Sequence, residues 1–139
     1  MDAIGKIDSE DAGKLVVRLM VGGLLLFHGI SKAFNGVDFI VKGLAAHHLP
    51  AFIAYGVYVG EILAPVLIIL GLWTRLSGLV VAFDLLVAIL LVRLPAMLTI
   101  SRGGGWAVEL DVFFLLGGLA ILFLGPGKLR FGRGKGMAS

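Results

Sequence analysis

Four long apolar runs, separated by short polar or glycine-rich stretches, dominate the pattern of the chain. They cover about residues 14–34, 51–73, 76–98 and 106–125. Each is close to the roughly 20 residues that an α-helix needs to cross the hydrocarbon of a bilayer. Only helices and closed barrels satisfy their backbone hydrogen bonds in lipid. The pattern therefore predicts an all-α integral membrane protein, a bundle of four transmembrane helices.

The connections between the runs are short enough to favour antiparallel neighbours. The stretch "GLWTRLSG" fits only a tight hairpin, and the three glycines of "ISRGGGW" suit a sharply turned exterior loop. Between the first two runs, "NGVDFIVKGLAAHHLP" is expected to hold a short interfacial helix. A polar segment, 1–13, precedes the runs and a basic tail, 126–139, follows them, so residues 1–139 form a single membrane domain.

Composition and charge add an orientation to this picture. Hydrophobic residues make up 59% of the 139 residues and charged residues 15%, with a mean hydropathy of +1.05, well above ordinary soluble domains. The basic residues near the termini and the middle hairpin outnumber those on the opposite side: Lys6, Lys14, Arg75, Lys128, Arg130, Arg133 and Lys135 against Lys32, Lys42, Arg93 and Arg102. The positive-inside rule then predicts a multi-pass protein of the cytoplasmic (inner) membrane with both termini in the cytoplasm.

Several kinds of chemistry are not expected in this chain. It has no cysteine, which excludes thiolate chemistry, iron–sulfur clusters and cysteine-ligated zinc within it. Only His28 lies within a run, so a bis-histidine haem is not predicted, and the glycine-rich tail lacks a phosphate-binding pattern. We expect no metal, haem or nucleotide, and no nucleic-acid partner, because the basic residues flank apolar runs.

Ionisable residues inside the runs are the candidate chemistry. At 100° per residue, Arg18, His28 and Lys32 fall on one face of the first helix. Such a polar face is expected to point into the bundle, where ionisable side chains usually line substrate or proton pathways. The ligand-binding or proton-relay candidates are His28, Glu61, Lys32, Glu109, Arg18, Asp84 and Arg93.

Depth in the membrane predicts how these charges pair. The expected pairs are Arg18 with Asp84, His28 with Glu61, and Lys32 or Arg93 with Glu109. An unpaired charge at the bilayer centre costs on the order of 3 kcal/mol on insertion scales. A purely structural role, in which the charge pairs only fix the register of the helices, stays open beside the functional one.

Small residues predict where the second helix packs closely. Gly56, Gly60 and Ala64 recur every four residues, which lets a neighbouring helix approach within the bundle or in a second copy of the chain. Pro65 is expected to kink this helix one turn beyond Glu61 and to free a backbone carbonyl near the acid.

The same residues carry a family resemblance. In order, "RLMVGGLLLFHGISKAF", "GEILAPVLIILGLWTRLSGL", "VRLP" and "GGGWAVELDVFFLLGGLAILFLGPGKL" resemble the DoxX family of small four-helix bacterial and archaeal membrane proteins, over about residues 15–130. The matching positions are Arg18, His28, Gly29, Lys32, Glu61, Gly71, Thr74, Arg75, Glu109 and the Gly125-Pro126-Gly127 exit. Arg93 departs from the pattern, since many members have a histidine in this stretch.

The resemblance implies a function linked to quinones or oxidative stress, in a family named for a thiosulfate:quinone oxidoreductase subunit. The leading hypothesis is a redox-associated subunit that binds a quinone or similar lipophilic molecule in the bundle and receives electrons from a soluble or membrane redox partner. Such a chain is not expected to be an enzyme alone. A non-catalytic scaffold for a soluble oxidoreductase and a small-molecule transporter are the alternatives, and a homo-oligomer is compatible with each.

Overall fold

The computed structural model describes residues 8–131, so the first seven residues of the polar segment and the basic tail from residue 132 onward lie outside the described part. Within 8–131 the chain is helical, and its only β pairing is one isolated bridge between Ile100 and Trp106. The predicted all-α class is confirmed.

Three helical stretches in the described residues are long and apolar enough to cross a bilayer. They are Ser9–Asn35, Ala51–Leu70 and Thr74–Leu98, with 27, 20 and 25 residues, and they coincide with the first three predicted runs. The first contains α1 (Ser9–Arg18) and α2 (Leu24–Asn35), the second α4 (Gly56–Tyr58) and α5 (Ala64–Leu70), and the third α6 (Thr74–Ala88). The expected short helix between the first two runs is α3 (Asp38–Ala46).

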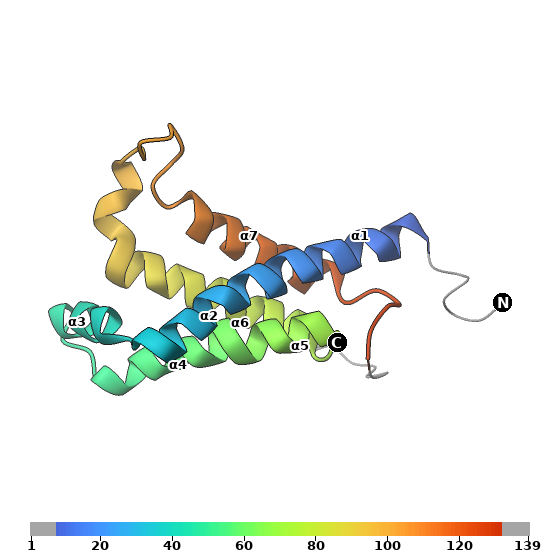
Figure 1. The fold of residues 1–139 in the computed structure, drawn as a ribbon, viewed down its shortest axis with the longest axis horizontal. Coiled ribbons are helices and arrows are strands. Elements are labelled where there is room, and N and C mark those ends of the chain that lie inside the picture. The colour runs from blue at the N-terminus through green and yellow to red at the C-terminus, as the bar shows by residue number, and fades with distance from the viewer. Residues whose placement is uncertain (1–7, 132–139) are drawn as a thin grey trace.

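The fourth run also forms a helix, α7 (Glu109–Leu124), which packs along α6 (Figure 1). Its 16 residues rise about 24 Å at 1.5 Å per residue, less than the roughly 30 Å of bilayer hydrocarbon. A fourth membrane crossing therefore stays a prediction, as does the cytoplasmic placement of both termini.

Each long stretch is interrupted by one π-helical turn, at Leu19–Gly23, Val59–Leu63 and Ile89–Arg93. Such turns insert an extra residue and are frequent at functional sites. The second turn contains Glu61 and lies just before Pro65 at the start of α5. Because proline has no N–H, the Glu61 carbonyl oxygen lacks its ordinary helical donor.

Glycines set the closest contacts between helices. A Cβ atom on Gly29 of α2 would collide with the freed Glu61 carbonyl oxygen. At the crossing of α6 and α7, a Cβ on Gly78 or on Gly118 would lie 2.6 Å from the other glycine's carbonyl oxygen. In the predicted small-residue row, Gly60 packs on the Asp84 side chain and Ala64 is buried in the core. Gly56 is exposed, and a Cβ added there would contact no other helix within 4 Å.

Arg18 ties together the end of the molecule that lies opposite α3. Its side chain is buried, and its Nε and Nη2 atoms donate to the carbonyl oxygens of Ile68 and Ile69 at 2.9 and 2.8 Å. Its Nη1 atom donates to the carbonyl oxygens of Pro126, at 2.9 Å, and Leu129. One guanidinium thus joins the first helix to the end of α5 and to the segment after α7.

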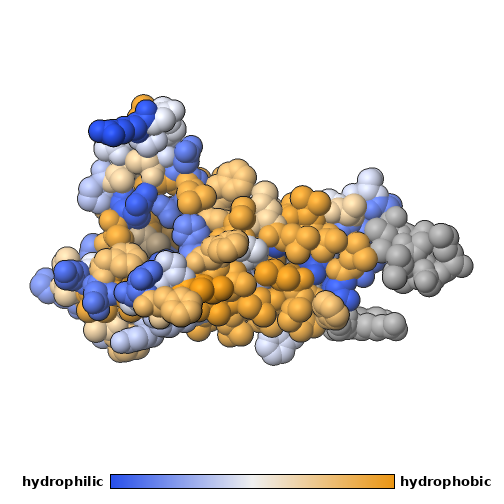
Figure 2. Space-filling model, in the orientation of Figure 1, coloured by the Kyte–Doolittle hydropathy of each residue, from blue (hydrophilic) through white to orange (hydrophobic). Residues whose placement is uncertain are grey.

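The surface is consistent with a lipid environment. Apolar residues cover the middle of the molecule, and polar residues gather at the α3 end and beside the loop before α7 (Figure 2). Large side chains such as Phe27, Phe83 and Phe123 are 73%, 66% and 74% exposed. A soluble monomer rarely exposes so much contiguous apolar surface, whereas a membrane protein presents it to lipid.

Candidate functional site

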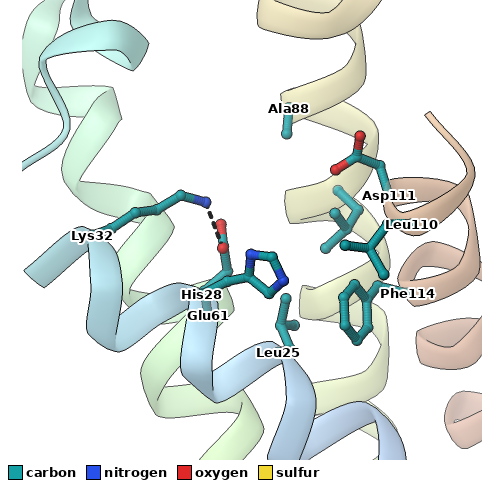
Figure 3. A pocket seen from close by; sticks show the side chains of 9 residues that line it. Leu25, His28, Lys32, Glu61, Ala88, Leu110, Asp111 and Phe114 are labelled. Atoms are coloured by element: carbon teal, nitrogen blue, oxygen red, sulfur yellow. Dashed lines mark hydrogen bonds and ion pairs between the residues drawn. The ribbon is translucent and has the colours of Figure 1, made fainter. Parts of the chain in front are cut away.

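A small cavity lies between α2, the π-helical turn at Val59–Leu63, α6 and α7 (Figure 3). It has a volume of about 50 Å³. Its walls combine four ionisable side chains with apolar ones: Leu25, His28, Lys32, Glu61, Leu85, Ala88, Leu110, Asp111 and Phe114. Leu25, Leu85 and Phe114 also belong to the main hydrophobic core, so the cavity rests on the core.

The central feature of the cavity is an ion pair between a partly exposed lysine and a buried glutamate. Lys32 Nζ on α2 lies 2.5 Å from Glu61 Oε1, with side-chain exposures of 21% and 3% (Figure 3). Removing two charges from water is costly, so such a pair persists only where geometry and further hydrogen bonds compensate. Its placement toward the α3 end leaves the Lys32 ammonium in contact with the cavity.

Asp84 lies behind Glu61, on α6. Its side chain lies against Gly60, where an added Cβ would come within 2.8 Å of the Asp84 Cβ, Cγ and Oδ1 atoms. Asp84 Oδ2 is buried and has no hydrogen-bond partner. Asp84 thus lies beside the residue that precedes Glu61, on the helix that also carries Leu85 and Ala88 of the cavity wall.

His28 lines the same cavity without pairing with Glu61. Its ring meets the Phe114 ring edge-on, with centroids 5.7 Å apart, and the residue is exposed on its other side. The pairing of His28 with Glu61 predicted from depth is replaced by that of Lys32 with Glu61. His28 is therefore available to hydrogen-bond a molecule in the cavity.

Asp111, which lines the cavity, forms a second ion pair. Arg93 Nε lies 3.2 Å from Asp111 Oδ2, and Arg93 Nη2 donates to the Ala107 carbonyl oxygen. Glu109, predicted as the partner of Lys32 or Arg93, instead packs against Gly105 of the preceding loop and is exposed. Asp111 takes the place in the cavity that was expected for Glu109.

The arrangement offers both hydrogen-bond donors and acceptors to a small molecule in the cavity. A water molecule needs about 10–15 Å³ of such volume, so the cavity has room for a few. Drug-sized ligands occupy pockets of about 300–1,000 Å³, so this cavity accommodates only the polar edge of a larger molecule. Lys32 and His28 supply donors, while Glu61 and Asp111 supply acceptors.

The family assignment follows from a comparison with known proteins. The DoxX family model matches residues 13–94, more than half of the chain. The chain belongs to the DoxX family. The matched part includes Lys32, Glu61 and Asp84 and ends within the third long helical stretch. The resemblance over residues 95–130, with Glu109 and the Gly125-Pro126-Gly127 exit, lies outside that match.

One curated DoxX relative is a protein of Bacillus subtilis (strain 168) named "Putative oxidoreductase CatD". It is 35% identical to this chain over 88 residues, which are 63% of this chain and 65% of the relative. The chain therefore spans slightly less than two thirds of that protein. No solved structure matches the chain.

The DoxX chain brings together most, not all, of the predicted site residues. His28, Lys32 and Glu61 share the cavity, Asp84 lies against Gly60 next to Glu61, and Arg93 pairs with the lining residue Asp111. Arg18 lies at the opposite end, bonded to backbone carbonyls rather than to Asp84.

Asp111 was missing from the predicted set. It lies three residues before Phe114, which places the two on one helical face. That spacing was the signal available in the sequence.

Proposed function

We propose that this DoxX protein is a redox-associated membrane subunit whose cavity binds the carbonyl end of a quinone or a similar lipophilic molecule. The observation that carries this is the Lys32–Glu61 pair, in which Glu61 is buried and both side chains line a cavity between apolar helices. The name of the B. subtilis relative supports an oxidoreductase context. We place the protein in the cytoplasmic membrane of a bacterium or archaeon, as a four-helix bundle with both termini in the cytoplasm.

The donors around the cavity fit a carbonyl ligand. Lys32 Nζ has three protons, of which Glu61 uses one, and His28 has no hydrogen-bond partner among the described residues. The volume admits the polar edge of a ring, while the rest of the ring and its tail would lie between α2 and α7, beside the exposed Leu110. A bound quinone supplies two-electron, two-proton redox chemistry; the side chains orient it and hold protons.

The electrons would come from a partner protein. This chain has no cysteine with which to ligate an iron–sulfur cluster. We therefore propose a subunit rather than a complete enzyme, with the redox centre carried by a soluble or membrane partner.

A second candidate function is a non-catalytic scaffold for such an oxidoreductase. The observation that favours it is the small size of the cavity, about 50 Å³, together with a Lys32–Glu61 pair that is complete without a ligand. In that case the charges hold the helices in register and bind nothing.

Quinone binding by matched acid variants tests the proposal. The purified protein in mild detergent is titrated with a short-tailed benzoquinone, and quenching of Trp73 and Trp106 fluorescence is measured. We expect Glu61→Gln, which leaves Lys32 without its anion, to weaken binding by about tenfold, or 1.4 kcal/mol. Glu109→Gln, which removes an exposed acid outside the cavity, should bind like the wild type.

The two functions give different results in this titration. Saturable quenching that depends on Glu61 and not on Glu109 supports the quinone site. No saturable quenching in any of the three proteins, or equal binding in all three, supports the scaffold. Native mass spectrometry of the same samples shows whether a quinone copurifies.

A further inference from the structure

An apolar groove runs between α6 and α7, on a face of α6 that the cavity beside Glu61 does not use. It has a volume of about 240 Å³, and every side chain that lines it is apolar: Leu79, Ala82, Phe83, Leu86, Leu115 and Leu119. The cavity meets α6 through Leu85 and Ala88 instead, so the groove is a separate feature. Because a bound water molecule needs polar partners, this groove suits hydrocarbon and not water.

Arg75 lies at one end of this groove. At 100° per residue, Arg75 shares a face of α6 with Leu79 and Leu86 of the groove wall. Its Nη1 atom donates to the carbonyl oxygens of Leu122 and Phe123, at 3.0 and 2.9 Å, near the end of α7. The guanidinium is therefore fixed between the start of α6 and the end of α7, where the groove reaches the ends of both helices.

The guanidinium of Arg75 has donors left for a ligand. Its Nε and Nη2 atoms have no acceptor among the described residues, and both lie against Gly125, whose missing side chain leaves room beside them. Two neighbouring donors of a guanidinium match the oxygens of a phosphate group. Arg75 is also the second residue of a helical stretch long enough to cross a bilayer, Thr74–Leu98. A phosphate donor at the level of the lipid headgroups thus lies at the end of a groove for hydrocarbon.

The charges around this end of the groove favour an anion. Arg130 packs against the turn that precedes α6 and adds a second cation. The first acid on α6, Asp84, lies more than two turns beyond Arg75, and the α7 acids Glu109 and Asp111 lie in the first turn of that helix, at its other end. Neither helix therefore supplies a carboxylate to the guanidinium.

We propose that the groove between α6 and α7 binds one anionic phospholipid, with its phosphate on Arg75 and an acyl chain along the apolar wall. Basic pockets between transmembrane helices bind anionic headgroups in this way. A second copy of the chain fits less well. If a two-fold axis along the membrane normal passed through the groove, the Arg75 of each copy would lie at the same level, and like charges would face each other.

Native mass spectrometry of the full-length protein tests the headgroup contact. The protein is purified in mild detergent and mixed with equal amounts of phosphatidylglycerol and phosphatidylcholine that carry the same acyl chains. We expect one phosphatidylglycerol to stay bound to the wild type, and its binding to be about fivefold weaker in Arg75→Gln. Arg102→Gln removes the same charge from the exposed loop before α7 and should bind like the wild type.

A second variant blocks the groove and keeps Arg75, because Arg75 also holds the end of α7. Leu119→Phe places a ring among the side chains of the groove wall. We expect it to weaken phosphatidylglycerol binding several-fold. Leu116→Phe adds the same ring at an exposed position of α7 outside the groove and should leave binding unchanged. Unchanged circular dichroism shows that each variant folds.

Each result decides the proposal. Binding that is weakened in Arg75→Gln and Leu119→Phe and kept in both controls supports the lipid site. Equal retention of the two lipids by the wild type, or unchanged phosphatidylglycerol binding in Arg75→Gln and Leu119→Phe, overturns it. A lipid-free dimer that Leu119→Phe converts to a monomer shows a second copy in the groove and also overturns it. Because no quinone is added, these outcomes are separate from the titration that tests quinone binding.

Discussion

Gly29 occupies the tightest contact around the candidate site. It packs on the Glu61 carbonyl oxygen that Pro65 leaves without an ordinary helical donor. The glycine lets α2 approach the second long stretch closely enough for Lys32 to reach Glu61. Because Gly29 has no side chain, the two helices lie close enough for Lys32, one turn further along α2, to pair with Glu61.

Adding one methyl group at Gly29 should therefore destabilise the protein. We expect Gly29→Ala to lower the free energy of unfolding by about 1–3 kcal/mol, the usual cost of overpacking. Thermal unfolding in detergent, followed by tryptophan fluorescence, measures the change. Gly23→Ala is the matched control, because a Cβ there has no atom within 4 Å; equal stability of the two variants would contradict the contact.

If Lys32 and Glu61 interact directly, the effects of replacing them on the free energy of unfolding should not add. Lys32→Met leaves Glu61 buried without its cation, so we expect a loss of about 3–5 kcal/mol. In Lys32→Met/Glu61→Gln no charge remains, and part of that loss should return. Chemical denaturation of the single and double variants checks this, and a double variant as unstable as the sum of the singles would speak against direct coupling.

The sequence predicted which residues line the site, but not how they pair. The candidate residues His28, Lys32 and Glu61 were accessible from helical spacing and depth, and the structure places them around one cavity. Their partners were not accessible, because depth in a membrane does not fix the rotation of a helix. Lys32 therefore takes the acid expected for His28.

Among the elements, the three π-helical turns explain the largest departure from expectation. The angles that placed Arg18 on the face of His28 and Lys32 assume 100° per residue throughout. The turn at Leu19–Gly23 lies between them and carries an extra residue, so this assumption fails across it. The amino-acid pattern does not predict such a turn. The long apolar helices, in contrast, follow directly from the hydrophobic pattern of the sequence.

The start of α1 should respond to acid. Asp8 caps the helix by accepting a hydrogen bond from the Asp11 N–H at 3.0 Å. That bond, with Lys128 nearby, lowers the pKa of Asp8. Because the pKa of Asp8 is lower in the folded protein, its capping hydrogen bond stabilises the helix fully at pH values above the ordinary aspartate pKa of about 3.9. This stabilisation is lost as the pH falls through the pKa that Asp8 has in the folded protein.

We accordingly expect hydrogen-exchange protection in the first turn of α1 to fall below about pH 4. Asp8→Asn keeps a capping side chain that does not titrate, so its protection should depend less on pH. Mass spectrometry of peptides covering residues 8–18 measures both proteins. Identical pH profiles would show that Asp8 is not the group responsible.

At the scale of the whole molecule, α7 decides the topology. It is too short to be counted with the three long helices by length and composition, yet it packs along α6 through the Gly78–Gly118 contact. If it crosses the membrane, the ends of the chain lie on one side; if it does not, they lie on opposite sides.

Reporter fusions distinguish these topologies. With four crossings and cytoplasmic termini, alkaline phosphatase fused after Gly104 should be active and the same enzyme fused after Phe131 inactive. A fluorescent protein that matures only in the cytoplasm should give the reverse pattern. Phosphatase activity at both positions would mean that α7 stays on the outer side.

The contacts of Arg18 have a consequence for biogenesis. Its acceptors lie 50 or more residues further along the chain, at the end of α5 and after α7. When the first helix leaves the ribosome, none of these carbonyl groups has yet been made, and the guanidinium has no partner in lipid. The buried position of this arginine therefore becomes favourable only after the end of α5 and the segment after α7 have been synthesised and have packed against the first helix.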